Sequence, residues 1–334
     1  MSRVLITGGA GFVGYHLAKR LADQKYQVTI ADNFFRGRRD RDFQELLQHP
    51  QVRLVEGDLT EKSAWDALEG GYEQVYHLVG LNGTKLFYEM PHEVLRIGIS
   101  TTMNALDWFR LSNNVPSAKI LYTSSNEAYA SALEAFDSLP LPTPEEVPLV
   151  IADTYNPRWS YGGQKLIGEL FFIHYARAHD FRMAIVRPHN FYGPRAGYEH
   201  AIPGIIERIG ARQDPFEIFG ADETRSFCFI DDAVEAIQRV MESTATDGGT
   251  YHIGTSVETN VGDLTETLLS LLQYAPKQKV IKQSPAGSVK RRLPAVSKIE
   301  RDTGWRAATP LEEGLRRTVE WYLRNPKVLR PSTS

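Results

Sequence analysis

Short apolar runs alternate with amphipathic segments along the first half of the chain. The apolar runs are rich in Val, Ile and Leu and lie at 4–7, 28–31, 52–55, 75–79, 120–123 and 184–186. The segments with helical periodicity lie at 12–23, 61–68, 94–111 and 157–178. Buried strands that alternate with helices are typical of a parallel sheet covered on both faces. The pattern therefore predicts an α/β fold with a doubly wound parallel sheet.

Beyond about residue 190 the order of elements is less regular. Helical periodicity returns at 202–209, 233–241 and 311–324, whereas 227–230 and 251–253 resemble strands. This part predicts a smaller C-terminal mixed α/β lobe. We expect residues 1–189 to form the sheet domain and 190–334 to form mainly the lobe, with the chain able to cross back between them. The segment 133–157 contains five prolines and little periodicity, which predicts a surface loop near the functional site.

A glycine-rich turn follows the first apolar run. Gly8, Gly11 and Gly14 lie three residues apart in TGGAGFVG, where a helical segment begins. Such a turn lets backbone amides at a helix N-terminus approach a pyrophosphate closely. Together with Phe12 and Val13 it predicts a Rossmann-type dinucleotide site. The alternative is a strand-to-helix turn that needs glycine only for its shape.

The residues after the second apolar run bear on the choice of cofactor. Asp32 could accept hydrogen bonds from an adenosine ribose diol and would repel a 2′-phosphate, which favours NAD over NADP. Arg36, Arg38 and Arg39 could instead pair with a 2′-phosphate, or they could form a solvated basic loop. The further cofactor contacts that we expect are Asn33, Asp58 and Leu59. For Asp58, the alternative role is that of a helix N-cap.

The amino-acid composition limits the classes of partner that the protein can bind. An apolar fraction of 42% and a charged fraction of 24% are ordinary for a globular protein, and a net charge of -3 gives no basic field for nucleic acid. The lone Cys228 excludes intrachain disulfides and a multi-cysteine zinc site, and no HExxH pattern points to a metal. No apolar run reaches the ~18 residues of a membrane span. We therefore expect a cytoplasmic protein with a small-molecule partner, no metal and no membrane contact.

The order of motifs along the chain resembles that of a known family. The chain is similar to extended short-chain dehydrogenase/reductases, specifically the NAD-dependent nucleotide-sugar epimerase/dehydratase family. The resemblance implies NAD as a retained cofactor, a nucleotide-diphosphate sugar as substrate, and a homodimer joined through the helices at 94–111 and 157–178. The apolar faces of those helices fit packing within one subunit equally well. The motifs that carry the resemblance are TGGAGFVG, ADNFFRGRR, GDL, YHLVG, YTSSNEAY, YGGQK, RPHNFYGPR, TRSFCFIDD, YHIGT and RRLPAVSKIERDTGW.

The resemblance assigns the acid/base chemistry to Tyr161 and Lys165. The two residues are four apart on a predicted helix and so share one face. We expect Lys165 and the nicotinamide charge to lower the pKa of the tyrosine, so that Tyr161 acts as general base toward a sugar hydroxyl. Ser125 aligns with the serine or threonine that binds the reacting oxygen. Gln164 departs from the small residue usual before the lysine, which bears on packing behind the nicotinamide.

The residues after Ser125 bear on which reaction follows oxidation at C4. Glu127 occupies the position of a glutamate that exchanges the C5 proton in related dehydratases and decarboxylases. Asn126 stands where some dehydratases carry the aspartate that protonates the leaving hydroxyl, and an amide cannot do this. The segment NPRWSY resembles the one before the tyrosine in a bacterial UDP-glucuronate decarboxylase. Decarboxylation or dehydration of a UDP-sugar is therefore the leading interpretation.

Three other functions remain open at this stage. A 4-epimerase would pass through the same 4-keto intermediate without net redox change. A non-catalytic NAD-sensing protein is the alternative from another class. Such a protein would lack the Tyr161–Lys165 pair, whereas both residues are present here. A net reductase that consumes NADPH is suggested only by the arginines after Asp32.

A nucleotide diphosphate needs cationic or amide donors when water is excluded. By resemblance, Arg225 and Arg292 contact the diphosphate and Asn190 meets its phosphate or sugar side. Arg195 is a further candidate contact. The residues expected to flank the sugar are His189, Glu199 and His200.

Overall fold

A seven-stranded parallel sheet forms the centre of the computed structural model, which describes residues 2–284 and 289–325. The strand order is β11-β6-β5-β4-β1-β2-β3, and every neighbouring pair is parallel. The chain winds outward from β1 to β3 and then returns to β4, so the order reverses between β1 and β4. Ligands bind at such a reversal in open parallel sheets. The strands are β1 (Arg3–Thr7), β2 (Gln27–Asp32), β3 (Val52–Glu56), β4 (Gln74–His77), β5 (Lys119–Thr123), β6 (Arg182–Pro188) and β11 (Thr250–Ile253).

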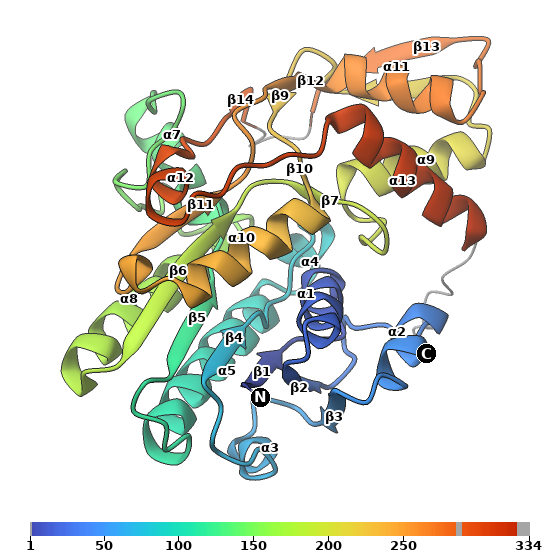
Figure 1. The fold of residues 1–334 in the computed structure, drawn as a ribbon. Helices are drawn as coiled ribbons and strands as arrows, with labels where there is room; N and C mark the ends of the chain where they lie inside the picture. Colours follow the sequence, from blue (N-terminus) through green and yellow to red (C-terminus); the bar gives the residue numbers. More distant parts are fainter. Residues whose placement is uncertain (1, 285–288, 326–334) are drawn as a thin grey trace.

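Helices cover both faces of this sheet. Figure 1 shows α1 (Phe12–Asp23) and α10 (Ile230–Glu242) over one face and α5 (Pro91–Ser112) and α8 (Trp159–His179) over the other. Each pair of helices forms a separate hydrophobic core with the sheet. Both faces of the strands are therefore buried, which explains why the strands appear in the sequence as continuous apolar runs. The predicted doubly wound sheet is confirmed.

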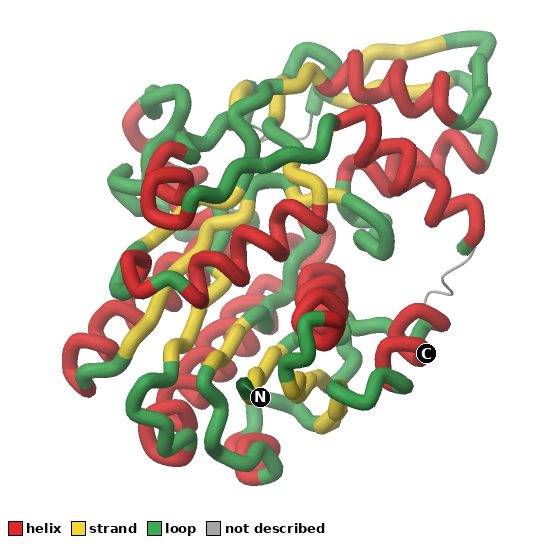
Figure 2. Tube along the Cα trace, in the orientation of Figure 1, coloured by secondary structure: helices red, strands yellow, loops and turns green. Residues whose placement is uncertain are grey.

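The C-terminal lobe lies over the carboxyl ends of the strands and consists of small sheets and helices (Figure 2). The chain crosses back, because α10 and the edge strand β11 follow the first lobe residues yet belong to the sheet layer. Residues 285–288 and 326–334 of the expected lobe lie outside the described residues. The lobe elements are β7 (Phe191–Tyr192), α9 (Ala201–Gly210), β8 (Phe216–Phe219), β9 (Thr224–Arg225), β10 (Cys228–Phe229), β12 (Thr259–Asn260), α11 (Val261–Leu271), β13 (Lys279–Lys282), β14 (Arg291–Arg292) and α13 (Leu311–Arg324). A 3₁₀ turn at Thr244–Thr246 and α12 (Ser297–Thr303) lie instead beside the sheet, next to α10 and β11.

Short helices account for most differences from the predicted elements. The segment expected to be a loop begins within α7 (Ala132–Phe136), and Ile230 starts helix α10 instead of ending a strand. A helix of five residues shows too little periodicity to be recognised. In the described residues, no helix is long and apolar enough to cross a membrane, and no group of ligating side chains could hold a metal ion. The other short helices are α2 (Arg41–Leu47), α3 (Lys62–Asp66), α4 (Thr84–Glu89) and α6 (Glu127–Ala130).

Candidate active site

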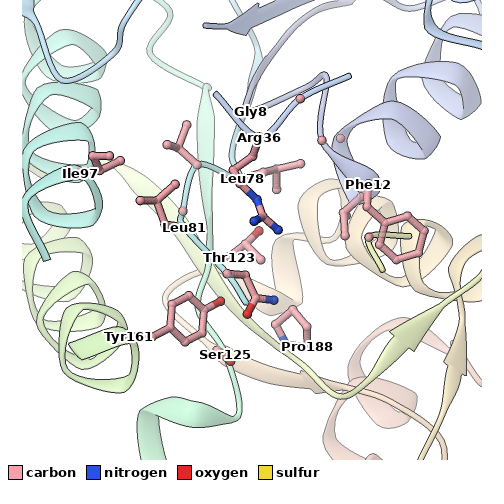
Figure 3. A pocket seen from close by; sticks show the side chains of 18 of the residues that line it. Gly8, Phe12, Arg36, Leu78, Leu81, Ile97, Thr123, Ser125, Tyr161 and Pro188 are labelled. Atoms are coloured by element: carbon pink, nitrogen blue, oxygen red, sulfur yellow. The ribbon is translucent and has the colours of Figure 1, made fainter. Parts of the chain in front are cut away.

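A cavity of about 470 Å³ opens at the carboxyl ends of the strands, where the strand order reverses. Figure 3 shows Gly8 and Phe12 on one side of it and Tyr161 and Ser125 on the other, with the Arg36 side chain entering between them. Residues from the lobe close the cavity. The cavity therefore joins the glycine turn to the predicted catalytic helix. The predicted residues that line it are Gly8, Gly11, Phe12, Val13, Gly14, Asp32, Asn33, Asp58, Leu59, Ser125, Asn126, Glu127, Tyr161, Lys165, Asn190, Arg195 and Arg292.

The glycine turn has the geometry that a dinucleotide requires. Gly8 adopts a φ of +76°, a conformation that residues with a side chain rarely adopt. A Cβ at Gly14 would overlap the Gly8 carbonyl oxygen, so only glycine lets α1 start this close to the turn. The first turn of α1 carries no acidic residue. Its amides and the positive end of the helix dipole are thus available to a pyrophosphate, and the chain fits NAD at this position.

Asp32 lies at the end of β2 with its carboxylate turned toward the glycine turn. Its Oδ2 accepts a hydrogen bond from the Ala10 amide at 2.9 Å and its Oδ1 accepts one from the Phe34 amide at 2.7 Å. Burial raises the pKa of this carboxyl, and the two amides oppose the rise. Asp58 accepts a hydrogen bond from the Thr60 amide at 3.0 Å. Asp58 does not cap a helix, because the N-cap residue of α3 is Glu61.

The three arginines after Asp32 take different positions. Arg39 pairs with Glu56 and stacks over an aromatic ring at 3.7 Å from the ring centroid. Arg36 approaches Glu199 across the cavity, with 3.6 Å between Nη2 and Oε2. Nη1 of Arg38 is buried and has no hydrogen-bond partner among the described residues. Of the three arginines, only Arg39 can therefore belong to a solvated basic loop, which was one of the two interpretations of the sequence.

The contacts of Arg195 differ from those expected of a residue that binds the substrate. Its Nε donates to Asp40 Oδ2 at 2.7 Å, and Nη2 donates to the carbonyl of Arg38 at 3.1 Å. Nη1 reaches the carbonyl of Gly11 at 3.4 Å, and the side chain is only 1% exposed. Arg195 therefore binds the loops around the glycine turn. The sequence could not indicate this, because Asp40 and Arg195 are 155 residues apart.

The structure distinguishes the two serines that follow β5. Ser124 is buried and donates to Glu169 Oε1 at 2.5 Å. Ser125 Oγ accepts a hydrogen bond from the Glu127 amide at 3.1 Å, and the Ser125 side chain lies near enough to Tyr161 to lower the pKa of its phenol. The structure thus brings Ser125, and not Ser124, to the tyrosine.

Tyr161 and Lys165 come from successive turns of α8, but they do not form a phenol–ammonium pair. Lys165 donates to the carbonyl of Thr123 at 2.7 Å, and its Nζ lies 5.7 Å from the centre of the Tyr161 ring. Burial lowers the pKa of Lys165 to about 7. Burial raises the pKa of Tyr161, and the nearby Ser125 hydroxyl only partly opposes this rise. The groups of the protein alone therefore do not give the lowered tyrosine pKa that we expected.

Glu127 lies in a cluster of charges beside Ser125. Arg292 Nη1 donates to Glu127 Oε1 at 2.8 Å and to Asn126 Oδ1 at 3.3 Å, and Arg158 Nη2 lies 3.5 Å from Glu127 Oε2. Burial would raise the pKa of Glu127, but Arg292 and Arg158 together hold it below its ordinary value. Glu127 is thus an ionised group of the cavity, not a solvated loop residue.

Two features of this cluster were not expected from the sequence. Arg292 contacts Glu127, whereas we expected it at the diphosphate. Arg158 lines the same cavity, although it was not predicted as a site residue. The sequence feature that could have identified Arg158 as a site residue is its position in NPRWSY, three residues before Tyr161.

The remaining substrate candidates lie on the lobe side. Asn190 lines the cavity and donates to the carbonyl of Ser226 at 2.9 Å. Arg225 pairs with Glu223 at 2.5 Å and is not among the described residues that line the cavity. Glu199 and His200 line it too. His189 is buried behind the site, with its Nε2 3.2 Å from the Tyr129 hydroxyl.

The similarities to known proteins agree with this geometry. The chain is 31% identical over 320 residues to UDP-glucuronic acid decarboxylase 6 of Arabidopsis thaliana, which covers 94% of this chain and 86% of that protein. It is 28% identical over 332 residues to UDP-N-acetyl-alpha-D-glucosaminuronate decarboxylase of Bacillus cytotoxicus, which covers 96% of this chain and 97% of that protein. The crystal structure of UDP-glucose 4-epimerase with UDP-glucose from Thermotoga maritima superimposes with a TM-score of 0.83 at 26% identity, over 97% of this chain and all of that one.

The family comparison covers the glycine turn, Asp32 and the helix of Tyr161 and Lys165. Residues 4–254 match the NAD dependent epimerase/dehydratase family. The predicted cofactor is confirmed as NAD by this match, and the predicted family by both sequence and fold. The chain therefore belongs to the NAD-dependent epimerase/dehydratase family of enzymes that modify nucleotide-linked sugars.

Proposed function

We propose that this enzyme decarboxylates a UDP-linked uronate through a 4-keto intermediate. The observation that carries the proposal is the ionised Glu127 between Arg158 and Arg292, beside Ser125 and Tyr161. A site with this surplus of guanidinium groups suits a sugar that carries its own carboxylate. The two decarboxylase relatives act, by their names, on UDP-linked uronic acids.

The roles of the residues follow from their positions. Held at the glycine turn, NAD would supply the acceptor for the hydride from C4 and the donor that returns it at the end of the reaction. Tyr161 takes the proton of the C4 hydroxyl, while Ser125 holds the same oxygen. The resulting 4-keto uronate is a β-keto acid, so its C5–C6 bond can break with loss of CO₂ and leave the electron pair in an enolate. C5 then takes up one proton, which comes from solvent through a water molecule. The ionised Glu127 carboxylate is placed to accept a hydrogen bond from that water and orient it, and Tyr161 returns its proton to the C4 oxygen.

We assign the nicotinamide ribose to Lys165 and the ribose diol of the adenosine to Asp32. The pyrophosphate is assigned to the glycine turn with Phe12 and Val13, and the adenine to Asp58 and Leu59. Asn190 and Arg225 are assigned to the substrate's diphosphate side. All of these residues except Arg225 line the cavity, and the assignment of Arg225 rests on the agreement of its motif with the family alone.

Epimerisation at C4 is the second candidate. It is favoured by the fold similarity to the Thermotoga maritima epimerase, and it would use the same Tyr161 and Ser125. Dehydration is less well supported, because the Asn126 amide next to Glu127 cannot protonate a leaving hydroxyl. A NADPH-consuming reductase would need the loop arginines for a 2′-phosphate, but Arg39 pairs with Glu56 and Arg36 approaches Glu199.

Mass spectrometry of UDP-uronates and UDP-hexoses incubated with the enzyme and NAD separates the reactions. We expect loss of CO₂ from a uronate, with no net change in NAD. A uronate of unchanged mass whose C4 configuration has inverted by NMR would contradict the proposal and establish an epimerase. Binding of NAD without change in any nucleotide sugar would point to the sensing protein.

We also propose a homodimer joined through α5 and α8 and a cytoplasmic location. The dimer is supported by large apolar side chains exposed on these helices, among them Met103 at 38%, Leu111 at 63% and Leu170 at 48%. The cytoplasmic location is supported by the single cysteine and by a cofactor of central metabolism. Light scattering of the purified protein that gave the mass of one chain would contradict the dimer.

A further inference from the structure

We propose that Arg158 is the specificity-determining residue for a carboxylate on C6 of the sugar. The inference rests on the proposed function, because among UDP-sugars only a uronate carries a carboxylate at that carbon. Arg158 would select the substrate and not take part in the bond changes.

The position of Arg158 is fixed by its own neighbours. It is the N-cap residue of α8, and its amide donates to Asn156 Oδ1 at 3.1 Å. Its guanidinium carbon lies 5.3 Å from the centre of the Trp159 ring, a favourable cation–π distance. The side chain is only 12% exposed and turns into the cavity toward Glu127. An arginine held in this way loses little further conformational entropy when a ligand binds.

The hydrogen-bonding capacity of this guanidinium is not filled by Glu127. The separation of 3.5 Å between Nη2 and Glu127 Oε2 is at the limit of a hydrogen bond, whereas Arg292 reaches the same carboxylate at 2.8 Å. Nε of Arg158 is buried and has no partner among the described residues. A buried donor on a charged group is costly to leave unpaired. The arrangement therefore favours a second anion beside Glu127.

The charges in the cluster lead to the same conclusion. One carboxylate, that of Glu127, faces the two guanidinium groups of Arg158 and Arg292. These three groups carry one positive charge in excess, in a place largely excluded from solvent. A carboxylate from the substrate would balance that charge, whereas a hydroxymethyl group would not.

The chemistry of the sugar separates this anion from the diphosphate. When the C4 oxygen lies at Tyr161 and Ser125, C6 lies at the same end of the sugar, because it is only two bonds from C4. The nucleotide is attached at C1, across the ring from C4. Arg158 lies three residues before Tyr161 at the start of one helix, so the two side chains are neighbours. A group next to Tyr161 therefore meets the substituents near C4, and among these the only anion is the C6 carboxylate of a uronate, not the diphosphate.

The test compares binding of two ligands that differ only at C6. A Tyr161→Phe background prevents turnover, and titration calorimetry with NAD present gives the affinities for UDP-glucuronate and UDP-glucose. In that background, Arg158→Met should weaken binding of UDP-glucuronate by about 10- to 100-fold, the value of a charged hydrogen bond, and leave that of UDP-glucose unchanged. Arg158→Lys, which keeps the charge but loses the planar fork, should give an intermediate loss. Arg177→Met, at the far end of α8, is the matched control and should change neither affinity.

Three outcomes would overturn the inference. An equal fall in both affinities would mean that Arg158 only supports the site, and no change in either would mean that it contacts no substrate. Equal affinity of the parent protein for the two ligands would mean that the carboxylate is not recognised at all. The assay is independent of the reaction: if the wild-type enzyme released no CO₂ but Arg158→Met still abolished the preference for the uronate, the inference would stand and the proposed reaction would fail.

Discussion

Replacing Glu169 by glutamine should destabilise the protein strongly, because this residue joins three elements of the site. Its Oε1 and Oε2 accept hydrogen bonds from Arg187 at 2.8 and 2.7 Å, and Oε1 also accepts from Ser124. The pair links α8, two turns after Tyr161, to β6 and to the turn that presents Ser125. The two side chains of the ion pair are only 3% and 5% exposed, so neither charge can be hydrated if the other is lost.

The size of the effect follows from burial. Removing one partner of a buried ion pair costs about 3–5 kcal/mol, since the remaining charge stays unpaired. An unfolding entropy of about 2.1 cal/mol/K per residue gives roughly 0.7 kcal/mol/K for 334 residues, so the expected fall in Tm is about 4–7 °C. Glu313→Gln is the matched control: its partner Arg316 is 50% exposed, and the loss should be below about 1 kcal/mol.

Thermal unfolding of the two variants, followed by circular dichroism at one scan rate, measures this difference. We expect kcat to fall in Glu169→Gln as well, because the variant loosens the Ser124 turn next to Ser125. A fall in Tm no greater than that of Glu313→Gln would refute the reasoning. It would mean that the Arg187 charge finds water or another partner, and that the three elements are held by their apolar packing alone.

Three further predictions concern the cofactor turn, the helix contact behind it and the charge on Glu127. Gly14→Ala should abolish NAD binding, measured by fluorescence titration, since its Cβ would overlap a carbonyl oxygen of the glycine turn. Gly98→Ala should lower Tm because a Cβ there would overlap the Gln164 side chain, and adding Gln164→Ser should restore it; no rescue would contradict the contact. Arg292→Met should move the acid limb of kcat/KM to higher pH, because burial then raises the pKa of Glu127 while Arg292 now holds it below the ordinary value. With the lowered pKa, ionised Glu127 stabilises the fold above about pH 4.3, and this contribution is lost as the pH falls through the folded value. An unchanged acid limb would mean that Glu127 does not have to be ionised.

The sheet was predictable because it depends on local signals. Each inner strand is buried on both faces and therefore appears as an apolar run, and the glycines at 8, 11 and 14 are needed by one tight turn. Short elements such as α7 and the two-residue strands of the lobe were not predictable, because they contain too few residues for a period to show. Their positions are set by contacts with distant parts of the chain.

The same distinction separates the predicted from the unpredicted parts of the site. Tyr161 and Lys165 could be placed together because one helix carries both. Glu127 and Arg292, by contrast, are 165 residues apart and meet only because the lobe folds back over the sheet. Resemblance assigned each of them a separate role, acid/base work for one and the diphosphate for the other. Their contact of 2.8 Å changes both roles, because Arg292 holds the pKa of Glu127 down and one Arg292 nitrogen is committed to the Glu127 carboxylate.

This coupling bears on how the site can tell one sugar from another. In the proposed reaction, Tyr161 and Ser125 act on C4, which hexoses and uronates share, so these two residues cannot discriminate between the sugars. The cluster of Glu127, Arg158 and Arg292 carries one positive charge in excess and meets the part of the sugar where the two differ. In the proposed reaction, the scaffold supplies oxidation at C4. The fate of the 4-keto intermediate is then decided by charges that come from three separate segments of the chain.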